Sequence, residues 1–250
     1  MDLGLEGKVA VVTGASRGIG RTIATTLAAE GCRTALIARD AATLSKAALE
    51  IGPRSSAHPA DVTDPDTCRR VVDEVVQRHG KIDVLVCNVG SGASVPPGSE
   101  TPAEWRRVFD LNFFATTNMI EASRPVLANG AAIVCISSIC GIERLGAPVT
   151  YDAANAALNA YVRGMVRPLA EAGVRINALA PGNVLTPDGR WAERRRENPQ
   201  AIETFLKREV ALGRFADAQE ISDVVAFLAS PRSSFVTGAL WVADGGQIRS

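Results

Sequence analysis

The chain has 250 residues, with 27 basic and 27 acidic side chains and therefore no formal net charge. Hydrophobic residues make up 46% and charged residues 22%, proportions that are ordinary for a globular domain and leave no electrostatic footprint for nucleic acid. The apolar stretches are too short to span a bilayer, and the N-terminus lacks the layout of a signal peptide. We therefore expect a cytoplasmic protein without nucleic-acid or membrane partners.

The cysteines are too few and too irregularly spaced to indicate a metal site or a disulfide framework. There are five, an odd number, and no pair has the CxxC spacing of a zinc site. They are Cys32, Cys68, Cys87, Cys135 and Cys140. We expect most of them to be buried thiols in a reducing compartment, and we expect no metal.

Short β-branched runs alternate with longer helical patterns along the whole chain. Strands are expected at residues 8–13, 33–38, 56–60, 82–88, 131–137, 174–179 and 239–242. Several are unbroken apolar runs, such as VAVV and IDVLVC, which is typical of parallel strands buried on both faces. This alternation predicts βαβ units with right-handed crossovers. The expected fold is therefore α/β: residues 1–250 form one doubly wound Rossmann domain with a seven-stranded, mainly parallel sheet and helices on both faces.

Capping residues mark the starts of two helices. Asp64 followed by Pro65 offers a side-chain cap and a proline for the first helical turn. Thr101 and Glu104 have the spacing of a capping box, in which the two residues satisfy each other's backbone N–H groups.

A glycine-rich segment, TGASRGIG, covers residues 13–20 between the first strand and the first helix. Its glycines permit a tight turn and a close approach to a pyrophosphate, while the helix N-terminus supplies unpaired N–H groups. Such a segment by itself also serves ordinary strand-to-helix turns. Its position after the first strand favours a dinucleotide site. The residues expected to form it are Gly14, Ser16, Arg17, Gly18, Ile19 and Gly20.

The second expected strand ends at Ala38 and is followed by Arg39 and Asp40. In a doubly wound sheet this tip lies beside the adenosine ribose, where an acid binds ribose hydroxyls and an arginine binds a 2′-phosphate. Arg39 and Arg17 together favour NADP(H) over NAD(H), whereas Asp40 favours the opposite choice. Alternatively, Arg39 and Asp40 are solvated turn residues.

Together these motifs resemble the common type of short-chain dehydrogenase/reductase, and among them the 3-oxoacyl-carrier-protein reductases, over essentially the whole chain. TGASRGIG looks like the family's cofactor loop, and Cys87-Asn88-Val89-Gly90 stands where the family usually has Asn-Asn-Ala-Gly. The resemblance implies further cofactor contacts from Asp61, Val62, Asn88, Gly90, Tyr151, Asn155, Pro181, Gly182, Val184 and Thr186.

The resemblance also implies a catalytic set: Ser138, Tyr151, Asn112 and Asn155. Ser138 would bind the carbonyl oxygen, Tyr151 would exchange a proton with it, and Asn112 would hold a water chain. The family signature is Tyr-x3-Lys, but here Asn155 follows Tyr151 at the lysine position. In the family that lysine binds the nicotinamide ribose and lowers the pKa of the tyrosine.

The expected function is an NADP(H)-dependent oxidoreductase that reduces a ketone or oxoacyl-type carbonyl to a secondary alcohol. Loss of a unit charge about 4 Å from the phenolate costs roughly 1 kcal/mol in water and ~4 kcal/mol at an effective dielectric of 20. Three interpretations stay open: a weakened or specialised reductase, an active reductase with a substitution introduced at position 155, and a protein that binds dinucleotide without redox turnover, as a regulator, isomerase or lyase.

The loops after the fourth, fifth and sixth strands are expected to hold a small-molecule carbonyl or alcohol substrate, and residues 186–210 to form a lid over it. Arginines occur in or near these loops at positions 144, 190 and 194–196. They either bind an anionic group of the substrate or belong to a solvated, self-paired helix face. The family commonly forms homotetramers, so a homo-oligomer, tetramer or dimer, is expected.

Overall fold

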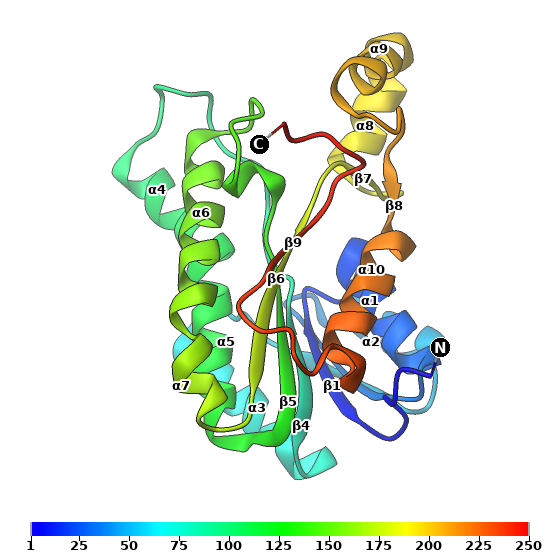
Figure 1. Cartoon of the computed structure of the whole chain (residues 1–250), viewed down its shortest axis with the longest axis vertical. Helices are drawn as coiled ribbons and strands as arrows, with labels where there is room; N and C mark the ends of the chain where they lie inside the picture. Colours follow the sequence, from blue (N-terminus) through cyan, green and yellow to red (C-terminus); the bar gives the residue numbers. More distant parts are fainter. Residues whose placement is uncertain (1, 250) are drawn as a thin grey trace.

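The computed structural model describes residues 2–249, and in this range seven strands form one sheet (Figure 1). Their spatial order is β3-β2-β1-β4-β5-β6-β9, and each described pairing is parallel. The strands are β1 Val9–Thr13, β2 Arg33–Ala38, β3 Ser55–Pro59, β4 Ile82–Cys87, β5 Leu127–Ile136, β6 Arg175–Pro181 and β9 Leu240–Ala243. The predicted single α/β domain is confirmed. The order reverses between β1 and β4, which is where doubly wound sheets bind ligands.

The expected strands are all present, and β5 departs furthest from its expected bounds. It begins at Leu127 instead of residue 131, because Leu127 pairs with Ile82 before a register shift in the β4–β5 ladder. Asn129 and Gly130, which have the composition of a turn, are thereby included in the strand. A second sheet pairs β7 Val184–Leu185 with β8 Ala216–Asp217. Two-residue strands are too short to show periodicity, so the sequence did not predict them.

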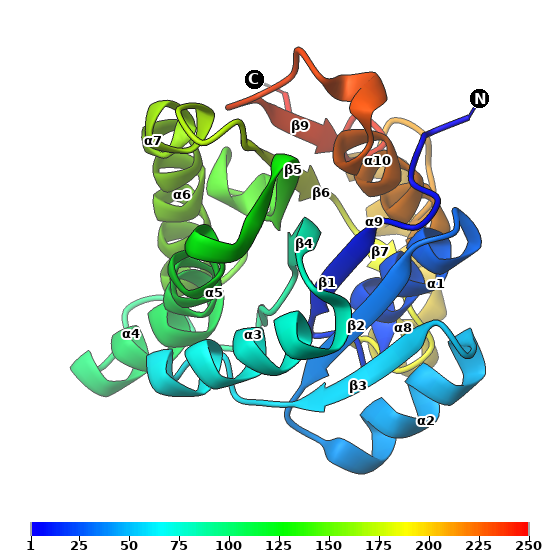
Figure 2. The ribbon, with the colours of Figure 1, turned by 90° about the horizontal axis from the view of Figure 1, so that it is seen from below.

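The helices cover both faces of the sheet. Figure 2 shows α1, α2 and α10 on one face and α3, α5 and α6 on the other. Their bounds are α1 Gly18–Ala29, α2 Ala41–Ile51, α3 Pro65–His79, α5 Ala115–Ser123, α6 Val149–Gly164 and α10 Ala218–Ala229. Strand β1 is an unbroken apolar run because both of its faces are buried. Val9 and Val11 lie in one hydrophobic core, while Ala10 and Val12 lie in the other. Neither face is exposed, so no polar alternation occurs.

The remaining helices are α4 Pro102–Phe109, α7 Val166–Ala170, α8 Arg190–Glu197 and α9 Pro199–Glu209. Of these, α4, α8 and α9 lie toward the carboxyl ends of the strands, whereas the short α7 directly precedes β6 at the opposite end (Figure 1). Helices α8 and α9 extend beyond the sheet and lie within the segment expected to be a lid (Figure 1). Trp191 joins them by stacking on Phe205, with ring centroids 5.2 Å apart. Whether this segment closes over a substrate stays a prediction.

The described residues include no helix with the length and apolar character needed to cross a membrane. The five cysteines are free; four are buried, and Cys140 is partly exposed. Burial raises the pKa of the Cys32 and Cys68 thiols to about 12, so both stay protonated and act as small apolar side chains.

Candidate active site

A cavity of about 1190 Å³ lies at the carboxyl ends of the central strands. Most small-molecule sites measure roughly 300–1,000 Å³, so this cavity has room for a dinucleotide and a substrate together. Every residue that the sequence analysis singled out for the cofactor or for catalysis lines it. These are Gly14, Ser16, Arg17, Gly18, Ile19, Gly20, Arg39, Asp61, Val62, Asn88, Gly90, Asn112, Ser138, Tyr151, Asn155, Pro181, Gly182, Val184 and Thr186. The structure brings them together, while their individual roles stay predictions.

The glycine-rich loop has the geometry of an anion site. Gly14 and Gly18 have φ values of +65° and +57°, in the left-handed region that favours glycine. A Cβ on Gly20 would lie 2.4 Å from both the Gly14 carbonyl oxygen and Asn88 Nδ2, so this position admits only glycine. The residue before α1, Arg17, makes no side-chain cap. The first N–H groups of α1 are therefore available to bind a pyrophosphate.

The Asp40 carboxylate is already hydrogen-bonded to the protein's own backbone. Its Oδ1 accepts a 2.7 Å hydrogen bond from the backbone N–H of Thr43 and caps α2. Interactions with Thr43 hold the pKa of this carboxyl below its usual value. Arg39 and Arg17 line the same part of the cavity, and in the described chain neither forms an ion pair. The end of the cavity beside β2 therefore presents two guanidinium groups and a carboxylate that is already bound.

Ser138 and Tyr151 come from the end of β5 and from the first turn of α6. Ser138 Oγ accepts a hydrogen bond of 3.2 Å from the backbone N–H of Cys140, and its hydroxyl lies within hydrogen-bonding reach of Tyr151. Asn155 lies one turn after Tyr151 and is 3% exposed. Its Nδ2 donates to the Tyr151 backbone carbonyl oxygen at 2.9 Å. The amide is thereby tied to its own helix.

Burial raises the pKa of Tyr151 above the ordinary value of 10. Hydrogen bonding with Ser138 and Asn155 acts in the opposite direction, while Cys140 and Asp152 add to the increase. None of these neighbours is a cation, so nothing in the described chain compensates electrostatically for the missing lysine. Tyr151 therefore stays a neutral phenol, a proton donor, through the neutral pH range.

Asn112 lies in a π-helical turn, Asp110–Phe114, between α4 and α5. Its Oδ1 accepts from the Ser91 backbone N–H at 2.8 Å, and its Nδ2 donates to the Val108 carbonyl oxygen at 2.9 Å. A Cβ on Gly90 would lie only 2.9 Å from Asn112 Oδ1, so glycine allows this close approach. Such π-helical turns occur frequently at functional sites because they interrupt the regular helical hydrogen bonds.

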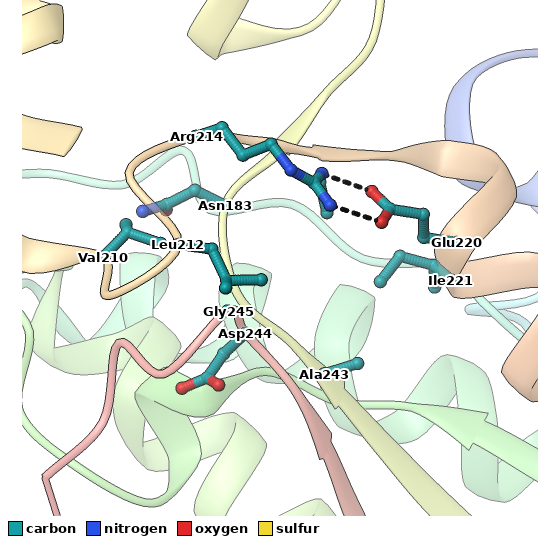
Figure 3. A pocket seen from close by; sticks show the side chains of 10 residues that line it. Asn183, Val210, Leu212, Arg214, Glu220, Ile221, Ala243, Asp244 and Gly245 are labelled. Atoms are coloured by element: carbon teal, nitrogen blue, oxygen red, sulfur yellow. Dashed lines mark hydrogen bonds and ion pairs between the residues drawn. The ribbon is translucent and has the colours of Figure 1, made fainter. Parts of the chain in front are cut away.

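A smaller pocket of about 170 Å³ lies between β7, β8 and the C-terminal segment. Figure 3 shows Arg214 and Glu220 joined beside it by two hydrogen bonds, each 2.7 Å long. Asp244 accepts from the backbone N–H groups of Gly246, Gln247 and Ile248. The charged groups of this pocket already have protein partners, so we place cofactor and substrate in the larger cavity.

Comparison with known proteins agrees with this geometry. The sequence profile of a family described as "Enoyl-(Acyl carrier protein) reductase" matches residues 14–247. The 3-oxoacyl-[acyl-carrier-protein] reductase FabG of Thermotoga maritima is 34% identical, over 98% of this chain and 99% of its own length. The chain belongs to the short-chain dehydrogenase/reductase family. It is therefore an NAD(P)-dependent oxidoreductase, as the motifs predicted.

Two solved structures of the family have nearly the same fold. The L-sorbose reductase of Gluconobacter frateurii, complexed with NADPH and L-sorbose, has a TM-score of 0.95 and 29% identity, with both chains covered completely. An NADPH-bound short-chain oxidoreductase of Pseudomonas aeruginosa, described as having an atypical catalytic center, has a TM-score of 0.91 and 31% identity, with 97% of each chain covered. The family thus includes a member that binds NADPH and is described as departing from the usual centre.

The sequence analysis missed several residues of this site. Arg107 and Leu111 line the cavity from the helix that carries Asn112, and helical spacing could have indicated both. Asn159 is 6% exposed and lies beside the loop that holds Ser138, a contact that no motif indicates. Of the arginines at positions 144, 190 and 194–196, which the sequence analysis placed in or near the substrate loops, Arg190 alone lines the cavity. Arg144 instead binds Asp152.

Proposed function

We propose that this protein is an NADP(H)-dependent reductase that converts a ketone or oxoacyl-type carbonyl to a secondary alcohol. The observation that carries the proposal is the single cavity that joins the glycine-rich loop to Ser138 and Tyr151. Residues at the ends of β2 and β5 line the same cavity, so a dinucleotide held by the glycine-rich loop would supply its hydride near the two hydroxyl groups. This is the arrangement that carbonyl reduction requires.

The chain's own residues would bind and protonate the carbonyl oxygen. The nicotinamide cofactor supplies the hydride when it is bound. The Ser138 hydroxyl, whose oxygen already accepts from Cys140, would donate its proton in a hydrogen bond to the carbonyl oxygen. Tyr151 would deliver a proton to the same oxygen as the alcohol forms. The raised pKa of Tyr151 supports the reductive direction, because reduction begins from the protonated phenol.

The Asn155 amide supports a specialised reductase better than a reversible dehydrogenase. Alcohol oxidation needs the Tyr151 phenolate as a base, and no neighbouring cation stabilises that anion. An uncharged amide can still hydrogen-bond to a ribose hydroxyl, so cofactor binding does not depend on a lysine. We therefore propose that reduction persists near neutral pH while oxidation becomes efficient only at alkaline pH.

NADP(H) is proposed as the preferred cofactor. Arg17 and Arg39 line the cavity without ion-pair partners in the described chain, and they supply the donors that a 2′-phosphate needs. Asp40 is used as the cap of α2 and is thus less available to ribose hydroxyls. The solved relatives with NADPH support the same choice.

A homo-oligomer, tetramer or dimer, is proposed from the surface of the domain. Phe235 is fully exposed, Phe114 on the π-helical turn is 45% exposed, and Val242 on the edge strand β9 is 42% exposed. Burial of these apolar side chains between copies of the chain would remove them from water and favour association. Light scattering during gel filtration measures the mass directly, and a monomer would contradict the proposal.

The free thiols support the expected cytoplasmic, reducing location.

The test is NADPH consumption against a panel of ketones by the wild type, Tyr151→Phe and Asn155→Lys. We expect turnover by the wild type and loss of about 10²–10⁴-fold in Tyr151→Phe, which removes the proton donor. Asn155→Lys should lower the pH midpoint of alcohol oxidation by about 1–3 units, because the new cation stabilises the phenolate.

Tyr161→Phe is the matched control, since it removes the other tyrosine hydroxyl of α6, which is buried without a hydrogen-bond partner among the described residues. It should keep full activity. If NADPH binds but no variant turns over any ketone, the protein is a dinucleotide-binding protein without redox chemistry, and the proposal is wrong.

A further inference from the structure

The loop after β4, residues 91–94, is held from two sides by arginines that line the cavity. Arg107 of α4 donates from Nη2 to the Ala93 carbonyl oxygen at 2.8 Å. Arg190, the first residue of α8, donates from Nη1 to the Gly92 carbonyl oxygen at 3.3 Å. Both arginines line the same cavity as Ser138. Two guanidinium groups from distant parts of the chain therefore meet at the substrate end.

Arg107 is fixed by a network that ends beside the catalytic tyrosine. Glu104 accepts from Arg107 Nε at 2.8 Å and from its Nη2 at 2.7 Å, and it also accepts from the Ser94 hydroxyl at 2.7 Å. Because the Ser94 proton is used there, the Thr150 hydroxyl donates to Ser94 Oγ at 2.7 Å. Thr150 is fully buried and directly precedes Tyr151. The Arg107 side chain is thus held in place before any ligand arrives.

Both guanidinium groups keep donors that the protein does not use. A guanidinium has five N–H groups. For Arg107 those of Nε and Nη2 are taken by Glu104 and Ala93, and in the described chain no acceptor binds Nη1. Arg190 has a single described acceptor, the Gly92 carbonyl oxygen. Unused donors on two cavity-lining arginines are available to a ligand.

The charge balance at this end of the cavity is positive. Hydrogen bonds from Arg107 and Ser94 lower the pKa of Glu104 to about 2, so its carboxylate stays ionised and neutralises Arg107. Arg190 has no acidic partner within residues 2–249. Among the residues that line the cavity, the acids are Asp40 and Asp61, and both belong to the adenosine end. The Arg190 guanidinium therefore lines the cavity without an ion-pair partner among the described residues.

We propose that Arg107 and Arg190 bind an anionic group of the substrate, a carboxylate or a phosphate, so that the ketone reduced here is a charged one. This inference rests on the proposed function and names the substrate class of the same site. Guanidinium groups bind both anions through paired N–H donors, and the network to Thr150 positions Arg107. The anion would lie between α4 and α8 and direct the carbonyl toward Ser138.

The experiment compares three ketones of equal chain length: a 3-oxo carboxylic acid, its neutral methyl ester, and an oxoalkyl phosphate. With the wild type we expect the preferred anion to exceed the ester in kcat/KM by about 10–100-fold. Arg190→Gln and Arg107→Gln should remove this preference, because they raise the KM for the acid and the phosphate more than the KM for the ester. The acid and phosphate arms distinguish the two sources of the anion.

Arg106→Gln is the matched control, because Arg106 is an exposed neighbour on α4 that does not line the cavity. It should keep the preference of the wild type. Equal kcat/KM for acid, phosphate and ester in the wild type, or an equal loss in Arg106→Gln and Arg190→Gln, would overturn the proposal even though reduction itself is observed. If no ketone turns over, the proposed function fails, and calorimetry with the 3-oxo acid then tests the anion site by itself. Binding that is lost only in Arg107→Gln and Arg190→Gln supports the anion site. Absence of binding to the wild type overturns the anion site.

Discussion

Among single residues, Arg39 and Asp40 show how a neighbour's geometry supports one of two cofactor choices that the residue types leave open. Side by side in the sequence, they favour opposite cofactors. In the structure Asp40 binds the backbone N–H of Thr43, and stabilisation of its charge by α2 makes this a favourable use of the carboxylate. Arg39 has no such partner in the described chain and lines the cavity.

Replacement of Arg39 therefore tests cofactor preference. Arg39→Gln should raise the KM for NADPH by about 10–100-fold, because a charged hydrogen bond to the 2′-phosphate is lost, and should change the KM for NADH much less. Steady-state kinetics with both cofactors provide the measurement. Arg33→Gln is the control, since Arg33 begins the same strand at its other end and is exposed. An equal rise in the KM for NADPH and the KM for NADH would show that Arg39 does not bind the 2′-phosphate.

Between elements, Asn159 joins α6 to the loop that follows β5. Its Oδ1 accepts from the Ser137 hydroxyl at 2.7 Å, and its Nδ2 donates to the Gly141 carbonyl oxygen at 3.2 Å. These two contacts enclose Ser138 on both sides. Gly141 is also tight against α6, because a Cβ there would lie 2.7 Å from the Asn155 backbone. Asn159 therefore sets the position of Ser138 relative to the helix that carries Tyr151.

Asn159→Leu should leave the Ser137 hydroxyl and the Gly141 carbonyl without a partner, at a cost of about 1–3 kcal/mol in the free energy of unfolding. We expect kcat to fall more than KM rises, because Ser138 loses its position while the cofactor loops are untouched. Urea unfolding and ketone kinetics measure both effects. Val162→Ala, a cavity-forming change on the same helix, should destabilise the protein without this loss in kcat. Equal kcat losses in the two variants would refute a positioning role.

The helix that begins at Pro102 shows that a local sequence pattern can predict one capping contact correctly and miss another. Thr101 caps it as expected, with Oγ1 accepting from the Glu104 backbone N–H at 3.2 Å. The Glu104 side chain, however, does not complete the predicted capping box; it binds Arg107 and Ser94 instead. A doubly hydrogen-bonded guanidinium is a stronger partner for a carboxylate than one backbone N–H group. The carboxylate that the sequence assigns to the helix end thus binds an arginine that lines the cavity.

In the whole molecule, two histidines lie at the outer edge of the sheet, where β3 meets α3. Ser56 Oγ is 2.9 Å from His58 Nε2 and 3.2 Å from His79 Nε2. Burial lowers the pKa of both imidazoles below the ordinary 6.5; Arg78 contributes to this, and Glu74 opposes it at His58. The folded protein therefore holds both side chains neutral at a pH at which the unfolded chain begins to protonate them.

Acid should consequently weaken the fold. The unfolded chain binds more protons than the folded protein in mild acid. The stabilisation that the two neutral histidines contribute is therefore fully present above pH 6.5 and falls as the pH drops through 6.5. This contribution stops falling once the pH is below the lowered pKa values of the folded state, because the histidines are then protonated in both states. Urea midpoints measured between about pH 8 and pH 5 should show this decline. His79→Gln removes one titrating group and should make the decline shallower. An unchanged slope in that variant would mean that other groups cause it.

The sequence by itself determined the fold class and the order of the strands along the chain, and it predicted which residues form the cofactor loop and the catalytic set. These features depend on local regularities: apolar runs mark strands buried on both faces, and glycines mark backbone turns that only they can adopt. The same residues line one cavity because parallel strands bring their carboxyl ends to one edge. Only the tertiary structure decided which partner each polar group takes. Asp40 caps α2, Glu104 binds Arg107, and Asn159 binds the loop that holds Ser138. The sequence could not predict these partners, because such hydrogen bonds depend on distances that no sequence spacing specifies.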